Sequence, residues 1–430
     1  MKKLISTIIF ALILAACTAD NNFLETPAES YELATEIEIE TAPPTAETEQ
    51  TTILSRLAAR QPTEISIDAA LQDVEFLVQT LEENFPFLGV TARITDNDNP
   101  LESFRNTLTT ALSTHTGDIT TEQFENLLRD GFNENLIISL AHLNLSQAGI
   151  IMAPEEFFSV PQGTTSHIIE EGRIALLTIP QALFDEAAFA MREIQDFIAK
   201  IQGYEHIILD LRYVVGGFMD APMSTLISPN ISETLIFQEF AFITNGTMAQ
   251  DAYNRELAIA RTTNANRRNT GNFVLRDIVD GSILPAAEFA ELHNLTEINQ
   301  DDLQNLAYGF VLETLVPPVD SALRLPLLAE NIWLLVGQNN FSAASITAQI
   351  AKAAGFTLVG ETTNHANSWA RSFVFLPNSG HSLQMDMFYL TDSTGRNIEE
   401  FPPEPHYFNR PGMDALQTTL AIIAERAEME

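Results

Sequence analysis

The sequence is poor in cysteine and in basic residues. One cysteine occurs in 430 residues, so no disulfide can form within the chain and no cysteine cluster can hold zinc. Lys and Arg together number 22 against 58 Asp and Glu, which gives a formal net charge of −36. A polyanion offers few cations to exchange for phosphate counterions, which argues against a nucleic-acid partner and against docking on anionic lipid through a basic patch.

Other signatures are missing as well. The chain has neither the Walker A pattern nor the dinucleotide-binding glycine fingerprint, so a nucleotide-dependent function has no support in the sequence. By contrast, the apolar content of 45% is ordinary for a globular protein. The length of 430 residues suffices for one large or two medium domains, each with its own core.

The N-terminus has the pattern of a secretory signal. Residues 1–17 read MKKLISTIIFALILAAC, in which two lysines, an apolar run and small residues precede the single cysteine. The apolar run is too short for a permanent membrane-spanning helix. The last four residues resemble the lipobox of bacterial lipoproteins, in which the signal is cut before the cysteine and the sulfur receives diacylglycerol.

This resemblance implies that residues 1–16 are a signal peptide and that Cys17 is the site of lipidation. The protein would then reside at the bacterial cell envelope, outside the cytoplasm, and would touch the membrane through its lipid anchor only. The alternative is an unanchored secreted protein whose signal ends in cysteine by chance.

An acidic segment follows the cysteine. Between Thr18 and Ser55 there is no Lys or Arg, whereas Asp and Glu recur and Thr, Pro and Ala fill much of the rest. Such a composition cannot bury enough apolar surface to offset the entropy of ordering it. We therefore predict that residues 17–64 form a disordered tether, which its own charge extends.

Residues 65–150 carry helical patterns. Ser66 can cap a helix whose apolar residues recur with a 3.6-residue period up to Phe85, and a proline then closes it. Thr121 opens a second helical pattern, which leads into the apolar run at 136–140. The sequence therefore predicts a small helical N-terminal subdomain.

From residue 170 to residue 430 the pattern changes to alternating strands and helices. The expected elements are strand 174–179, helix 184–201 and strand 206–211, and then strand 332–337, helix 342–354 and strand 356–360. Strand–helix–strand units imply parallel pairing with helices covering the sheet, so we predict an α/β core. The polar segment at about 245–320 has a mixed pattern, and we expect it to be an insertion or a helical excursion from this core.

Two loops of the predicted core hold residues suited to chemistry. Ser342 lies between a strand and a helix, where backbone N–H groups and the helix dipole favour developing negative charge. The ordinary alternative is a serine that only caps the helix. Gly216 and Gly217 follow another strand, and adjacent glycines let backbone N–H groups approach an anion closely. A plain tight turn is the alternative there.

Four segments, in order, resemble the C-terminal processing (tail-specific) peptidases, whose relatives include the tricorn core protease. They are LDLRYVVGG at 209–217, FSAAS at 341–345, LVGETT at 358–363 and an acidic, proline-rich segment at 398–406. The resemblance implies a crotonase-like core and a serine-type peptidase that hydrolyses peptide bonds of a peptide or protein substrate through an acyl-enzyme. It implies neither a metal nor an organic cofactor.

The resemblance also implies roles for single residues. Ser342 would be the nucleophile, and the N–H of Ala343 would bind the oxyanion together with that of Gly216 or Gly217. An acid and a base complete such a site, because a serine hydroxyl is a weak nucleophile until a base accepts its proton.

The base differs between branches of the family. The processing branch takes a lysine from the segment after VGE-T, but residues 362–368 contain none and Lys352 falls inside the predicted helix. The tricorn-like branch takes a histidine from the N-terminal subdomain and an acid downstream, which correspond here to His142 and Glu399. A neutral imidazole suits proton transfer near pH 7, and a carboxylate can fix its tautomer.

Alternatives remain open for both groups. His142 could be an ordinary packed histidine, and His365, in the loop where the other branch keeps its lysine, is the second choice for the base. His381 also lies in this part of the chain. Glu400 and Glu404 compete with the predicted acid, which could equally be a solvated loop residue.

The chain departs from the family pattern in ways that leave two further functions open. Val214 and Val215 stand where the glycine loop usually has Asn and Gly, and the stretch between His142 and Gly172 is too short for a PDZ domain. A catalytically impaired, peptide-binding lipoprotein of the same fold is one alternative. A solute-binding lipoprotein, which would need two comparable α/β lobes, is the other.

Overall fold

The computed structural model describes residues 62–136, 143–147, 164–268, 275–320, 323–325, 327–364 and 370–429. The predicted signal peptide, Cys17 and nearly all of the predicted tether lie outside these ranges. So do two of the three candidate bases, His142 and His365, and most of the apolar run at 136–140.

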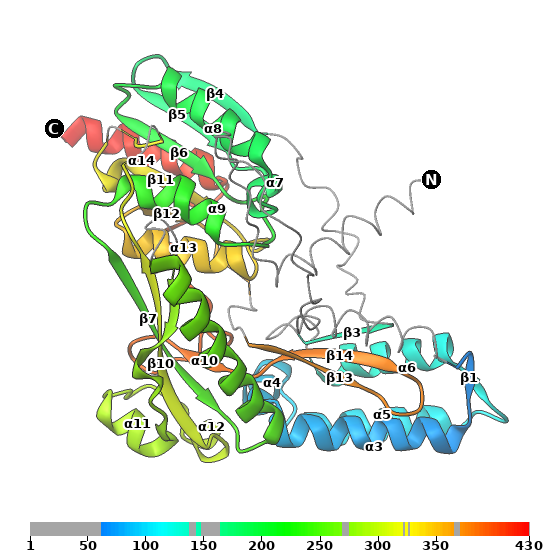
Figure 1. The fold of residues 1–430 in the computed structure, drawn as a ribbon. Helices are drawn as coiled ribbons and strands as arrows, with labels where there is room; N and C mark the ends of the chain where they lie inside the picture. Colours follow the sequence, from blue (N-terminus) through cyan, green and yellow to red (C-terminus); the bar gives the residue numbers. More distant parts are fainter. Residues whose placement is uncertain are drawn as a thin grey trace, which may run out of the picture.

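A six-stranded sheet forms the centre of the predicted α/β core (Figure 1). Its strands, in spatial order, are β16 (Tyr407–Phe408), β12 (Thr357–Gly360), β11 (Ile332–Val336), β6 (His206–Asp210), β5 (Ile174–Thr178) and β4 (Thr165–Glu170). All neighbours pair in parallel except β4, which runs antiparallel to β5. The α/β class with βαβ units is therefore confirmed.

Helices cover both faces of this sheet. The elements α7 (Gln181–Phe184), α8 (Ala188–Lys200) and α13 (Ala343–Ala353) contribute to the apolar core on one face, and α14 (Ala415–Met429) packs on the other. Because both faces are covered, β5, β11 and β12 are buried at every position, which explains their continuous apolar runs. The helix predicted at 184–201 is confirmed as α8, but it begins at Ala188 and not at residue 184. Glu186, with φ +57°, lies between α7 and α8, and a left-handed residue cannot continue a right-handed helix.

Among the described residues, the N-terminal part contains four helices. They are α3 (Ile67–Asn84), α4 (Leu88–Thr95), α5 (Pro100–Ser113) and α6 (Thr121–Asn135), with a two-stranded ribbon of β1 (Glu64–Ile65) and β2 (Ile119–Thr120). Ser66 accepts a hydrogen bond from the Ala69 N–H, so the predicted cap of α3 is confirmed. Thr120 forms a capping box with Gln123 at the start of α6. The sequence pattern did not predict α4 and α5.

Two further sheets complete the fold. One consists of β15 (Tyr389–Thr391), β7 (Leu235–Ile243), β10 (Tyr308–Val316), β8 (Leu275–Ile278) and β9 (Leu284–Pro285), and the other of β13 (Arg371–Phe375), β14 (His381–Asp386) and β3 (Asn144–Gln147). The helices α10 (Thr247–Arg268), α11 (Ala286–Leu292) and α12 (Gln300–Asn305) connect the strands of the first. The segment at 245–320 thus holds strands as well as helices, and β10 pairs with β7 along its whole length.

The remaining short elements follow the glycine loop or precede a strand. They are α9 (Asp220–Pro222), a π-helix (Met223–Ile227) and three 3₁₀ turns at Ser228–Asn230, Val279–Gly281 and Ala329–Asn331. None of the helices in the described ranges is both long enough and apolar enough to cross a bilayer.

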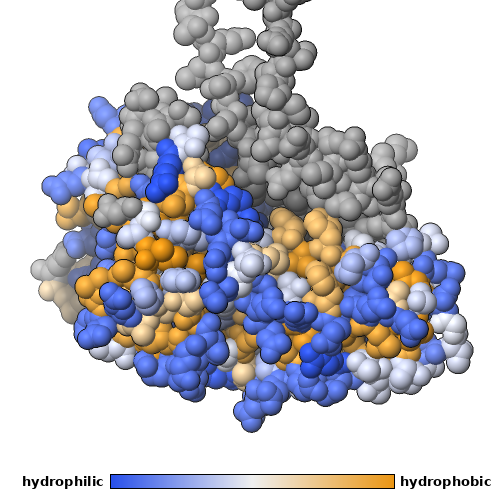
Figure 2. All heavy atoms as spheres, turned by 60° about the horizontal axis from the view of Figure 1, so that its bottom comes forward, coloured by the Kyte–Doolittle hydropathy of each residue, from blue (hydrophilic) through white to orange (hydrophobic). Residues whose placement is uncertain are grey.

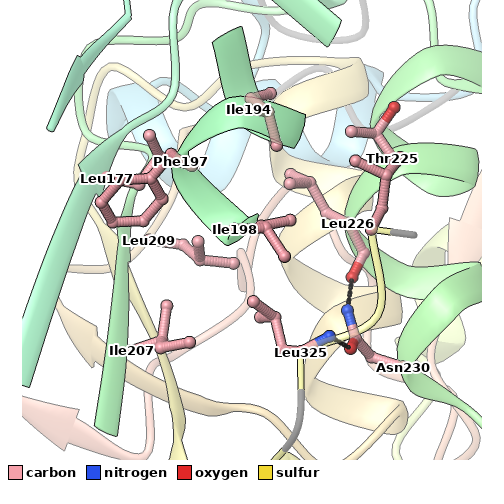
Figure 3. A pocket seen from close by; sticks show the side chains of 11 residues that line it. Leu177, Ile194, Phe197, Ile198, Ile207, Leu209, Thr225, Leu226, Asn230 and Leu325 are labelled. Atoms are coloured by element: carbon pink, nitrogen blue, oxygen red, sulfur yellow. Dashed lines mark hydrogen bonds between the residues drawn. The ribbon is translucent and has the colours of Figure 1, made fainter. Parts of the chain in front are cut away.

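A small cavity lies inside the core of the six-stranded sheet, and Figure 3 shows apolar side chains of α8, β5 and β6 pointing into it. Its volume is about 10 Å³, which is about the space of one water molecule. Thr225 and Asn230 are its only polar lining residues among those described. It is therefore a packing void rather than a place for a peptide.

Candidate active site

Ser342 occupies a strained turn between β11 and α13. Its φ of +50° and ψ of −124° lie in a region that non-glycine residues adopt only at a cost. The side chain makes no capping hydrogen bond to the helix, so the structure does not support the alternative of a plain N-cap. A strained serine at a strand-to-helix turn is the geometry that exposes a nucleophilic hydroxyl and directs the next backbone N–H towards the same space.

Asn340 holds this turn in place. Its fully buried side chain accepts the Gly337 N–H at 2.9 Å and donates to the carbonyl oxygens of Leu211 at 2.7 Å and Val214 at 2.9 Å. One amide therefore ties the serine turn to the loop that follows β6. Sequence reasoning missed Asn340, because Leu211 and Val214, the two partners that join it to the other loop, lie more than a hundred residues away.

The glycine loop packs directly against the serine turn. The Phe341 N–H donates to the Val215 carbonyl at 2.8 Å. A Cβ on Gly216 would lie 2.6 Å from the Phe341 oxygen, 3.2 Å from Ser342 Cβ and 3.5 Å from the Ala343 nitrogen. Such a close approach allows only glycine there. The structure thus brings together Ser342, Ala343 and the glycine pair, and the valines that replace the usual residues do not push the loop away.

Of the three candidate acids, Glu399 is the buried one. It is 0% exposed, and its turn is held by Asn397, whose side-chain oxygen accepts the N–H groups of Glu399 and Glu400 at 3.0 Å each. Glu400 pairs with Arg93, and Glu404 is exposed. The possibility that Glu399 is a solvated loop acid is therefore wrong.

Arg93 of α4 links the acidic turn to two other elements. Its guanidinium donates to Glu400 at 2.6 and 2.9 Å and to Asp302 of α12 at 2.7 and 3.1 Å. The Tyr389 hydroxyl of β15 donates to the same Asp302 carboxylate at 2.7 Å. Hydrogen bonding, mainly to Glu400 and also to Asp302, raises the pKa of Arg93, although burial opposes this shift. Burial raises the pKa of Tyr389. Both groups therefore keep their protons at any physiological pH.

The segment after β12 joins the serine turn to the acidic segment. The Asn364 N–H donates to the Asn340 carbonyl at 2.8 Å, and the Thr363 N–H donates to the Pro403 carbonyl at 3.3 Å. The Thr363 hydroxyl also lies 2.7 Å from that of Ser345, one turn into α13. Residues 363–364 are therefore in backbone contact with the loops that carry Ser342 and Glu399.

His381, the one candidate base within the described ranges, faces α6. Its imidazole is 0% exposed, stacks edge-on to Phe124 and has Nε2 3.6 Å from Glu125 Oε2. Hydrogen bonding to the His381 imidazole, and more weakly to Arg129, holds the pKa of Glu125 below its ordinary value, although burial opposes this shift. These contacts are those of a core histidine. Lys352 is engaged too, since its Nζ donates to the Glu404 carbonyl at 2.8 Å.

A polar cavity of about 370 Å³ opens at the carboxyl ends of β6, β11 and β12. Its lining includes Arg212, Tyr213, Gln338, Asn339 and Glu361. The first two belong to the loop that leads to the glycine pair, and the next two belong to the loop that leads to the serine turn. The carboxyl edge of a parallel sheet is where such folds bind ligands. Among the described residues, no three His, Cys, Asp or Glu side chains are grouped so that they could hold a metal ion.

The sequence matches Peptidase family S41 over residues 173–407. The chain belongs to this family. Its members are serine peptidases, so the fold and the strained serine belong to a hydrolase scaffold. The S41 match includes the glycine loop, Ser342 and Glu399 and leaves out the N-terminal helices.

Solved structures resemble this S41 chain at low sequence identity. A candidate peptidase from Parabacteroides merdae is 10% identical, with a TM-score of 0.50 over 83% of this chain and 96% of the other. Mature CPAF complexed with lactacystin is 12% identical, with a TM-score of 0.49 over 80% and 94% of the two chains. A lipoprotein from Streptococcus agalactiae is 14% identical, with a TM-score of 0.41 over 91% and 100%. At such low sequence identities, structural similarity concerns the fold and not the function. No curated protein sequence matches the chain.

Proposed function

We propose that this S41 family member is an extracytoplasmic serine endopeptidase that cleaves peptide bonds through an acyl-enzyme on Ser342. The observation that carries the proposal is the strained Ser342 turn packed against the glycine loop. A serine in this sparsely populated positive-φ conformation costs about 1–3 kcal/mol and persists where the surroundings enforce it, as at a nucleophile.

The reaction follows from these groups. Ser342 Oγ attacks the substrate carbonyl carbon while its proton passes to an imidazole, and the carbonyl oxygen becomes an oxyanion. The Ala343 N–H and a glycine N–H stabilise that charge, each by about 3 kcal/mol. The amine leaves with the proton from the imidazolium, and water then repeats the sequence to release the acid and restore the serine.

In this proposal His142 supplies the imidazole and Glu399 orients it. Two observations support the assignment. His142 directly precedes Leu143, which is buried in the core that includes the N-terminal helices, and Glu399 is a fully buried carboxylate. A buried carboxylate beside an imidazole stabilises the imidazolium that forms during the reaction. His365 stays the second candidate.

A fluorophosphonate probe tests the nucleophile. We expect the wild type to be labelled at Ser342, as peptide mapping of the adduct shows, and Ser342→Ala to be unlabelled. Ser113→Ala, at an exposed serine of α5, is the matched control and keeps full labelling. If the wild type is labelled no better than Ser342→Ala, the proposed hydrolase activity is wrong. The catalytically impaired, peptide-binding lipoprotein of the same fold is then favoured.

Replacement of each histidine tests the base. His142→Ala is expected to slow labelling by a factor of roughly 10³ or more, because the serine then lacks its proton acceptor. His365→Ala is expected to stay within a few-fold of the wild type. The opposite pattern would move the role to His365.

We also propose that Cys17 anchors the protein to the membrane by lipid, which residues 1–17 support. Expressed in a bacterial host, the wild type should incorporate radiolabelled palmitate and sediment with membranes. Cys17→Ala should do neither. Unlabelled wild-type protein in the soluble extracellular fraction would favour the plain secreted alternative.

A further inference from the structure

The side chain of Gln181 binds two backbone groups of the glycine loop. Gln181 is the first residue of α7, and its Oε1 accepts the Val215 N–H at 3.0 Å. Its Nε2 donates to the Gly216 carbonyl at 2.6 Å and to Asp185 at 3.1 Å. Both hydrogens of the amide and its oxygen are therefore engaged, so the orientation of the Gln181 amide is determined.

These bonds decide which way the loop N–H groups point. In a trans peptide the C=O and N–H point in opposite directions, and the residues that the structure describes include no cis peptide bond. The Val215 carbonyl faces Phe341, so the Gly216 N–H points away from the serine turn. The Gly216 carbonyl faces Gln181, so the Gly217 N–H points away from Gln181.

The Gly217 N–H is left available by this arrangement. Among the residues that the structure describes, no acceptor binds the N–H of Gly217 or that of Ala343. Gly216, which directly precedes Gly217, packs so closely on the serine turn that an added Cβ would lie 3.5 Å from the Ala343 nitrogen. The two free donors therefore belong to loops that touch each other beside Ser342.

We propose that Gln181 is a positioning residue of the peptidase reaction, which holds the Gly216–Gly217 peptide so that the Gly217 N–H is the second oxyanion donor. This inference rests on the proposed function. Two consecutive glycines, with φ of +153° and +140°, do not restrain their own peptide plane. If the peptide flipped, a carbonyl oxygen would replace the N–H, and it would repel the developing oxyanion. The Gln181 donor to Gly216 prevents that flip.

The test is the kinetics of fluorophosphonate labelling in Gln181→Met, which has a similar length but neither hydrogen bond. The maximal rate constant of labelling, kinact, reports the covalent step, whereas KI reports binding of the probe. We expect kinact to fall by a factor of roughly 10–100 with KI within twofold, because a misplaced donor loses part of the 10²–10³-fold effect of an oxyanion donor. Gln202→Met, at an exposed glutamine after α8, is the matched control and should match the wild type.

The fraction of protein that is finally labelled distinguishes a positioning role of Gln181 from incomplete folding of the variant. A variant that folds incompletely loses labelled fraction, while its folded molecules react at the wild-type rate. The proposal is overturned if kinact of Gln181→Met stays within twofold of the wild type, if only the labelled fraction falls, or if only KI changes. If the wild type itself does not react, the proposed function fails instead.

Discussion

At the scale of single residues, Ser342 carries backbone strain at the candidate site. A serine at φ +50° and ψ −124° occupies a conformation that glycine adopts readily. The sequence predicted that Ser342 lies between a strand and a helix, but the strain is set by the Asn340 and Phe341 contacts to residues 211–215. Local pattern alone could not separate a helix cap from a nucleophile.

The strain at Ser342 can be measured by substitution. Ser342→Gly should be more stable than Ser342→Ala by about 1 kcal/mol in the free energy of unfolding, because glycine relieves the unfavourable φ. Urea unfolding of the two variants measures the difference. An alanine variant as stable as the glycine variant would mean that the turn relaxes when the hydroxyl is lost.

Gly360 lies close against the backbone of the neighbouring strand. Its φ is +143°, and a Cβ there would lie 1.9 Å from the Val336 oxygen of the neighbouring strand. Gly360→Ala should lower the free energy of unfolding by on the order of 3 kcal/mol, from strain and overpacking together. Gly172→Ala, where φ is +72° but nothing lies within 4 Å, is the control for strain alone. Equal losses in the two variants would contradict the steric argument.

At the scale of elements, Arg93 joins α4, α12, β15 and the turn of Glu399. Arg93→Met leaves the Asp302 carboxylate, which is 3% exposed, without its cation. We expect the free energy of unfolding to fall by about 3 kcal/mol, because a buried charge loses its partner. Arg105→Met, which breaks the exposed pairs with Glu75 and Glu102, should cost less than about 1 kcal/mol. Similar losses in chemical denaturation would show that the Asp302 site readjusts.

The contact between α6 and β14 predicts a pH effect. The pKa of Glu125 is lowered by His381 and Arg129, so the ionised carboxylate stabilises the folded state. This contribution is fully present above the ordinary value of 4.5 and is lost as the pH falls through the lowered pKa. The stability difference between the wild type and Glu125→Gln should therefore shrink on acidification below pH 4.5.

Urea unfolding between pH 3 and pH 7 measures this difference. Glu122→Gln, an exposed acid of the same helix, corrects for the change in net charge. A difference that stays constant over this range, or grows towards low pH, would contradict a lowered pKa of Glu125.

At the scale of the whole molecule, two apolar cores share a pair of long strands. One core unites the N-terminal helices with Phe240–Ile243 of β7 and Phe310 and Leu312 of β10. The core of the six-stranded sheet takes in the other ends of the same strands, at Leu235 and Val316. In Figure 1, β7 and β10 run from the six-stranded sheet towards α11 and α12. The segment at 245–320 is therefore part of the central packing.

The net charge of −36 also acts on the whole molecule. Figure 2 shows hydrophilic residues spread between apolar ones over one face. Charges of one sign repel each other in the compact state, and salt screens that repulsion. Raising the ionic strength from about 10 mM to 300 mM should therefore raise the Tm by on the order of 2 °C. Sodium chloride and tetramethylammonium chloride should act alike, and a Tm that falls with salt would contradict this reasoning.

The sequence by itself determined the features that depend on residues close together in the chain. The strands β5, β6, β11 and β12 were predictable because apolar runs buried on both faces leave a continuous pattern. The cap of α3 at Ser66 and the glycine pair depend on local chemistry in the same way. The four segments at 209–217, 341–345, 358–363 and 398–406, taken in order, were enough to indicate the peptidase family by resemblance.

Only the tertiary structure decided the features that depend on distant partners. Glu399 and Glu400 are adjacent in sequence, yet one is buried and the other binds Arg93, about three hundred residues away. Gln181 touches the glycine loop only because α7 packs beside it. Hydrogen bonds between residues far apart in the chain have no periodic signature, so chain folding alone determines which side chains meet at the site.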